Sequence, residues 1–156
     1  MLRNIVHAVA LAAVLMLCAC SQSAVAAEIP SSVSGDYVGG GWSCRVLAYA
    51  HPAGLPSTVI EYHCTDPQSI QRLGARTWWG CPVVGAYSER LWPWWTSTVL
   101  PAPPDSYLTI TAIIGDTLHT VIDGQPVQLS LAQTVQSPAP FNCYAPPALR
   151  FRVFGR

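Results

Sequence analysis

The stretch "WSCRVLAYAHPAGLPSTVIEYHC" (Trp42–Cys64) has two runs of β-branched, aromatic and small apolar residues around the turn cluster "HPAGLPS". Two such runs joined by a Gly- and Pro-containing turn predict an antiparallel hairpin. If the hairpin is symmetric about Gly54, Cys44 lies opposite Cys64 and Ala48 lies opposite Ile60. Directly opposed residues of antiparallel strands lie close enough for a disulfide. We therefore expect a Cys44–Cys64 bond inside this hairpin.

A disulfide needs an oxidising compartment, and the start of the chain predicts export. "MLRN" offers one positive charge, and "IVHAVALAAVLML" is an apolar run of about a dozen residues, which suits a signal peptide rather than a membrane span. "LCAC" (17–20) resembles the lipobox of bacterial lipoproteins, which implies a signal peptide over 1–19 and a lipid on Cys20. The alternative is cleavage near 26–27, after "AVA" (24–26), which would release a soluble periplasmic or secreted protein. The chain is exported in both cases.

Four cysteines remain in the mature chain, and an even number in an exported protein predicts two disulfides. With Cys44 assigned to Cys64, the second bond joins Cys81 to Cys143 and closes a long loop. Zinc is the alternative use of these cysteines, but the sequence has no Cys-x-x-Cys pair. We expect neither a metal nor a cofactor.

Short strands and tight turns dominate the rest of the chain. In "TLHTVIDGQPVQLSL", Asp123-Gly124 predicts a two-residue type I′ turn, and Pro126 makes the outer side of its strand locally an edge. "YLTITAII" precedes this hairpin, and a three-residue loop over 115–117 would pair Ile114 with Leu118 and keep the apolar faces together. "ALRFRVF" (148–154) alternates and predicts a last strand.

One segment predicts a helix. In "DPQSIQRLG", Asp66 suits the N-cap, Pro67 the first turn and Gly74 the position after the end, so we expect one short helix over about 66–73. The prediction is an all-β fold, a small antiparallel sandwich or barrel with this one helix, braced by two disulfides. Residues 20–34 read as a flexible tether and 35–156 as a single β domain.

The tryptophans provide the sequence's candidate ligand-binding residues. Five of the six lie between Thr77 and Pro101, and they are Trp78, Trp79, Trp92, Trp94 and Trp95. Neighbours on an extended chain point to opposite faces, so one member of each adjacent pair is exposed unless a loop covers it. We expect most of these indoles to be core and some to form an exposed recognition patch, in which Trp92 and Trp94 share a side.

Chemical motifs are otherwise weak. Glu61, His63 and Arg45 would share one strand face, either as an acid–base cluster or, the reading we favour, as surface charges. No Gly-x-Ser-x-Gly elbow appears and the cysteines are committed, so we expect no enzymatic activity. The chain has no lysine and a formal net charge of +0, which argues against nucleic-acid binding.

The sequence thus predicts a binding module of the bacterial envelope, in the outer membrane or periplasm and attached to the membrane only through the lipid on Cys20. Its partner would be a glycan, a peptidoglycan-like polymer or a protein. In one version of the last case, this chain is itself an inhibitor or immunity protein that blocks an incoming hydrolase. The alternative is a structural or assembly subunit that pairs through an edge strand.

Overall fold

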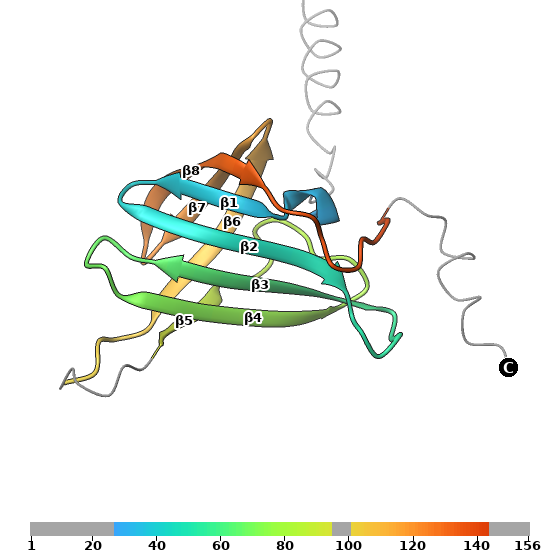
Figure 1. The fold of residues 1–156 in the computed structure, drawn as a ribbon, viewed down its shortest axis with the longest axis horizontal. Coiled ribbons are helices and arrows are strands. Elements are labelled where there is room, and N and C mark those ends of the chain that lie inside the picture. The colour runs from blue at the N-terminus through green and yellow to red at the C-terminus, as the bar shows by residue number, and fades with distance from the viewer. Residues whose placement is uncertain (1–26, 95–100, 144–156) are drawn as a thin grey trace, which may run out of the picture.

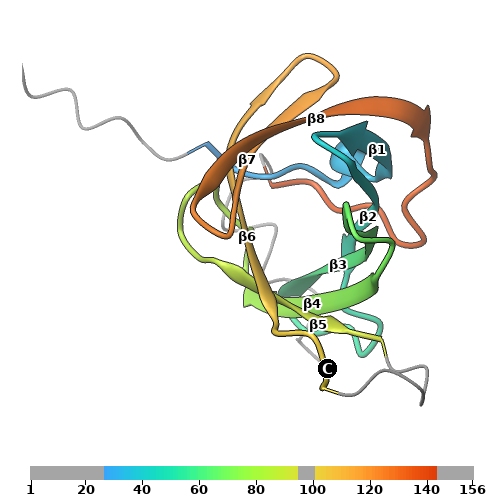
Figure 2. The ribbon, with the colours of Figure 1, turned by 90° about the vertical axis from the view of Figure 1, so that its left-hand side faces the viewer.

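Short turns join most consecutive strands, so each strand pairs with the next one along the chain. A computed structural model describes residues 27–94 and 101–143, and these form a closed antiparallel barrel in the strand order β1 to β8 (Figures 1 and 2). Its strands are β1 (Gly35–Gly39), β2 (Trp42–Ala50), β3 (Ser57–Thr65), β4 (Gln71–Trp79), β5 (Glu89–Pro93), β6 (Ser106–Ile114), β7 (Thr117–Ile122) and β8 (Gln125–Thr134). The predicted all-β class is confirmed, and of the two predicted architectures the barrel is the correct one.

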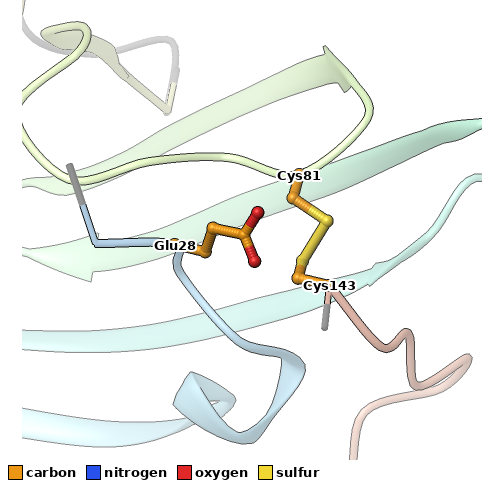
Figure 3. A group of neighbouring side chains, drawn as sticks. All are labelled: Glu28, Cys81 and Cys143. Carbon is orange, nitrogen blue, oxygen red and sulfur yellow. A yellow bond between two sulfur atoms is a disulfide. The ribbon is translucent and has the colours of Figure 1, made fainter. Parts of the chain in front are cut away.

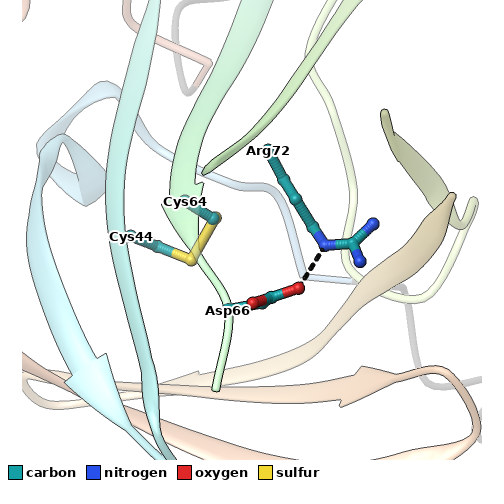
Figure 4. Close-up of a disulfide and its surroundings, with 4 residues drawn as sticks. All are labelled: Cys44, Cys64, Asp66 and Arg72. Atoms are coloured by element: carbon teal, nitrogen blue, oxygen red, sulfur yellow. Dashed lines mark hydrogen bonds and ion pairs between the residues drawn. A yellow bond between two sulfur atoms is a disulfide. The ribbon is translucent and has the colours of Figure 1, made fainter. Parts of the chain in front are cut away.

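The hairpin of β2 and β3 has the predicted register. Cys44 pairs with Cys64 and Ala48 with Ile60, and the two cysteines form a disulfide across the strands (Figure 4). The second predicted disulfide, Cys81–Cys143, is also present. The two bonds join positions 20 and 62 residues apart in the sequence, so they restrain the chain on both a short and a long range.

The helix predicted over 66–73 is wrong. β3 and β4 pair across their whole lengths, and the connection from Asp66 to Ile70 is a tight turn. The Asp66 carboxylate does accept the backbone amides of Gln68 and Ile70, at 2.9 and 2.8 Å. Ser69, however, has a φ of 65°, and the Asp66 amide donates to the Ile70 carbonyl at 3.0 Å. The capping signal was therefore real, but it stabilises a turn between two strands.

The two-residue turn predicted at Asp123-Gly124, which joins β7 to β8, is confirmed. Asp123 and Gly124 both have positive φ, and Val121 pairs with Pro126. The ladder between β8 and β1 covers Ser130–Thr134 and stops short of Pro126, so the outer side of Pro126 is locally an edge as predicted.

The three-residue loop predicted over 115–117 is wrong. The apolar faces of β6 and β7 are still brought together, but by a different feature. Ile114 pairs with Thr117 across a two-residue turn, and a β-bulge between Ile110 and Ala112 shifts the register. The bulge keeps Leu108 and Ile110 inside the barrel and turns Ile114 outward.

The end of the predicted tether belongs to the barrel. Ile29 and Val33 are buried in the core, and a 3-10 turn, η1 (Ser31–Val33), leads into β1. The Ile29 amide donates to the Pro82 carbonyl at 2.8 Å, and Glu28 forms a bridge with Val83. The tether prediction is therefore wrong for residues 28–34. The signal peptide, Cys20 and the strand predicted over 148–154 lie outside the described residues.

Side chains fill the interior. Alternate residues of the strands point inward and are buried, among them Tyr37, Val46, Ile60, Leu91, Leu108, Leu118 and Leu129. An eight-stranded barrel is just wide enough for its own side chains. The hollow at the mouth beside Trp78 has a volume of about 20 Å³, room for one water molecule and no larger ligand. Among the described residues this hollow is too small for a ligand, and the exposed aromatic side chains lie on the outside of the barrel.

Candidate functional site

The adjacent tryptophans of β4 lie on opposite sides of the sheet, as the period of a strand requires. Trp78 points inward and packs against the core, and its ring meets the ring of Tyr87 edge-on at 4.8 Å between centroids. Trp79 points outward and is 76% exposed. Trp78 is thus a structural residue, and Trp79 is an isolated indole at the end of its strand.

Trp92 of β5 and Trp94, which directly follows β5, are both exposed on the outer side of the sheet, as predicted. Leu91, which precedes Trp92, points inward and is fully buried. Trp92 is 39% exposed and Trp94 is 56% exposed. The Trp94 amide donates to the Gln71 carbonyl at 2.7 Å, which holds this end of β5 against β4. Trp95 lies outside the described residues.

The expectation that most indoles of this region are core is wrong for the four that the structure describes. Trp78 alone among them packs on the core, and Trp79, Trp92 and Trp94 are exposed. The remaining tryptophan, Trp42, is the buried one. Exposed indoles are uncommon, and the neighbouring pair Trp92 and Trp94 marks the outer face of β5 and the adjoining end of β4 as a candidate recognition surface. Trp79 lies at the far end of β4, outside this surface.

Strand register extends this surface across the sheet from the indoles. Trp92 lies opposite Leu73, Leu73 opposite His63, and His63 opposite Arg45. Directly opposed residues share a face, so these side chains form one outer row over β5, β4, β3 and β2. Asp36 of β1 continues the row beside Arg45.

At its β1 end the row enters a shallow open hollow of about 700 Å³. Its lining comes from β1, β2 and β3 and from the last residues of β8, and its polar members are Asp36, Ser43, Arg45, His63, Thr65 and Gln133. The outer face therefore combines indoles at one end with converging polar groups at the other, which is the usual composition of a ligand site.

Ion pairs fix the charged groups of the hollow. Arg45 donates to both carboxylate oxygens of Asp36, at 2.8 and 3.0 Å. These bonds hold the pKa of Asp36 below its ordinary value. His63 lies 4.0 Å from the carboxylate of Glu61. The sequence grouped Arg45 with Glu61 and His63 but missed Asp36, because that pairing depends on the register of β1 with β2.

Glu61 has a second partner that the sequence did not reveal. The Tyr49 hydroxyl donates to it at 2.6 Å. Burial, reinforced by this bond, raises the pKa of Tyr49 to about 12. Glu61 is thus tied to two outward side chains, which supports the surface-charge reading over an acid–base cluster.

A second cluster of charged groups lies at the barrel mouth. Glu89 accepts a bond from Arg76 at 2.9 Å, and the Arg76 guanidinium lies 4.8 Å from the centroid of the Tyr87 ring. Burial raises the pKa of Glu89 above its ordinary value, and the Arg76 bond partly opposes this shift. The hollow beside these groups has the volume of one water, so the cluster has no room for a substrate.

The opposite half of β4 carries a buried ion pair near the Cys44–Cys64 bond (Figure 4). Arg72 donates to Asp66 at 2.8 Å, and the two side chains are 5% and 1% exposed. A second nitrogen of Arg72 donates to the Pro104 carbonyl at 2.7 Å, so the pair also anchors the connection into β6. These bonds satisfy the buried charges and give them a structural role.

One group of potential metal ligands converges within the described residues. The ligand atoms of Glu28, Cys81 and Cys143 lie within 4.8 Å of one another (Figure 3). The two sulfurs are bonded to each other, however, and a metal binds cysteine as a thiolate. In this oxidised form the group is a disulfide with a neighbouring carboxylate.

Comparisons with known proteins identify no relative of this chain, so the site is interpreted from its own chemistry. A scan against models of protein families, a search of curated proteins and a search of solved structures each gave no match for this chain. Among the described residues there is no helix of the length and apolarity that a membrane span requires. The two disulfides indicate an oxidising compartment outside the cytoplasm.

Proposed function

We propose that this chain is an exported bacterial envelope protein whose barrel is a binding module, with Trp92 and Trp94 as the aromatic anchors of its outer face. The observation that carries the proposal is the exposure of both indoles on one side of β5, in register with the polar hollow. Aromatic anchors supply a large share of the binding energy at protein surfaces. The small volume of the hollow beside Trp78, about 20 Å³, adds support, since that hollow has room for one water molecule only.

The leader completes the proposal. Lipidation at Cys20, suggested by the lipobox-like "LCAC", would attach the module to the outer membrane from the periplasmic side. The mass of the mature protein from the envelope fraction tests this part separately. A diacylglyceryl-modified Cys20 is expected, and an unmodified product starting at Ala27 or Glu28 would refute it.

Strand addition has less support as the alternative function. In the assembly reading the chain would pair with another subunit through an exposed sheet edge. Barrel closure pairs β1 with β8, which leaves the residues of β8 around Pro126 as one short local edge among the described strands.

Cosedimentation with washed bacterial envelope fragments tests the binding function. The wild-type chain is expected to pellet with the fragments, and the variant with both Trp92→Ala and Trp94→Ala to lose at least about tenfold in affinity, since a pair of aromatic anchors is worth 2 kcal/mol or more. Trp79→Ala is the matched control, because it removes an even more exposed indole from the far end of β4. Equal pelleting of the double variant and wild type would overturn the proposal.

A further inference from the structure

The hollow on the outer face of β1, β2 and β3 extends the indole surface, and we propose that it is a carbohydrate subsite for an uncharged, hydroxyl-rich oligosaccharide lying across the strands. This inference rests on the proposed binding function and names its ligand class. The oligosaccharide would stack on Trp92 and Trp94 at β5 and reach the hollow at β1.

The register gives the ligand a path. The outer row from Trp92 through Leu73 and His63 to Arg45 crosses four neighbouring strands, and Asp36 adds a fifth. Four spacings between neighbouring strands span roughly 19 Å along the sheet. A second row, from Gln71 through Thr65 to Ser43, runs parallel to the first and begins beside Trp94. An elongated ligand of several rings fits this arrangement better than a compact one.

The charge of the residues that line the hollow favours an uncharged ligand. Arg45 is the permanently cationic side chain of the lining, and it is paired with Asp36, while His63 lies 4.0 Å from the Glu61 carboxylate. No net positive charge is left in the lining to attract a phosphate, a uronic acid or a nucleic acid. The same groups remain accessible, since the side chains of Arg45 and His63 are more than half exposed. They can exchange hydrogen bonds with neutral hydroxyls.

The lining supplies both kinds of contact that a sugar ring uses. Hydroxyls of Ser43 and Thr65 and the amide of Gln133 give uncharged donors and acceptors. Val38 and Leu47 add apolar surface within the hollow, and the indoles offer flat apolar faces for the C–H side of a ring. A protein partner would instead favour an apolar centre with a polar rim, whereas six of the nine residues that line this hollow are polar.

Binding to a panel of neutral and anionic oligosaccharides of one to six rings tests the inference, with the mature full chain as the protein. Neutral oligosaccharides are expected to bind, and their affinity to rise with length. Trp92→Ala should weaken binding at every length by at least tenfold. His63→Ala, in the hollow, should remove the gain of the longer oligosaccharides and leave the shortest ligands unchanged. Trp79→Ala is the control that should change nothing.

Three outcomes would overturn the carbohydrate assignment: binding of anionic members alone, no dependence on His63, or no binding to the panel. If the panel is blank while Trp92-dependent sedimentation with envelope fragments persists, the ligand is a protein or another envelope component and the binding function stands. If Trp92→Ala has no effect in either assay, both the ligand class and the binding function are wrong. Thermal melts of the His63 and Trp92 variants that match wild type establish that both are folded.

Discussion

The described tryptophans of this chain fall into a structural set and an exposed set. Trp42 is buried and Trp78 packs on the core, whereas Trp79, Trp92 and Trp94 are exposed. The division follows the alternation of side chains along β4 and β5. Adjacent residues of the same type can therefore have different roles.

Alanine substitution separates the two sets by stability. Trp78→Ala removes a ring that packs on the core and on Tyr87, and it should lower the free energy of unfolding by about 3 kcal/mol or more. Trp79→Ala should change it by less than about 0.5 kcal/mol, because that indole has few contacts to lose. Urea unfolding of both variants measures the difference. Equal losses would contradict the assignment of Trp78 as structural.

Breaking the buried ion pair should be far more damaging than breaking an exposed one. Asp66→Asn leaves the Arg72 charge buried without its partner, and a loss of about 3–5 kcal/mol in unfolding free energy is expected. Asp105→Asn is the matched control, since it breaks the exposed pair with Arg90 and should cost less than about 1 kcal/mol. A loss of the same size in both variants would show that the Asp66–Arg72 pair is not held in a buried environment.

Glu89 gives stability a pH dependence of known sign. Its raised pKa means that the folded state binds a proton over a pH range in which the unfolded chain does not. The protein is therefore less stable as the pH rises through that range, which begins at the ordinary pKa of a glutamate, and more stable as the pH falls back through it. The unfolding free energy of wild type relative to Glu89→Gln should increase on acidification. A gap that stays constant or changes in the opposite direction would contradict the raised pKa.

At the scale of strands and turns, closure of the barrel depends on a close approach of β1 to β8. A Cβ on Gly39 would lie 1.9 Å from the backbone carbonyl oxygen of Gln128. Gly39→Ala should therefore push the strands apart and destabilise the fold by about 1–3 kcal/mol. Ser130→Ala, on an exposed position of β8, should change stability by no more than about 0.5 kcal/mol. Guanidinium unfolding measures both, and a neutral Gly39→Ala would mean that the two strands do not meet there.

Hairpins were predictable from the sequence where turn chemistry and cross-strand pairing agree. The turn at Asp123-Gly124 and the opposition of Cys44 and Cys64 both fix a register locally, and both are confirmed. The segment after Asp66 was misread because the same side-chain capping occurs in helices and in turns. Only the long pairing of β4 with β3, a nonlocal interaction, decides between them.

The candidate site was predictable only in part, because it also depends on nonlocal strand pairing. Alternation correctly placed Trp92 and Trp94 on one side, because that inference needs nothing beyond the strand itself. The row that joins Trp92 to Leu73 and His63 requires β4 as a strand, and the sequence had assigned part of it to a helix. Asp36 could not be paired with Arg45 without knowing where β1 lies.

The whole molecule separates stability from recognition. The interior is filled by side chains, disulfides join β2 to β3 and Cys81 to Cys143, and buried ion pairs satisfy the inward charges. None of these features is needed on the outer face of β1 to β5, where the indoles and the hollow lie. Under the proposed function, the ligand would therefore lie on this outer face.

Photo-crosslinking in intact cells tests that claim most directly. A benzoylphenylalanine in place of Leu73 would lie between Trp92 and His63 on the outer row, and one in place of Ile114, which is 63% exposed, would lie at the turn between β6 and β7. On irradiation, a ligand site on the outer face of β1 to β5 predicts an adduct with an envelope component from position 73 and none from position 114. An adduct from position 114 alone, or from neither position, would contradict it.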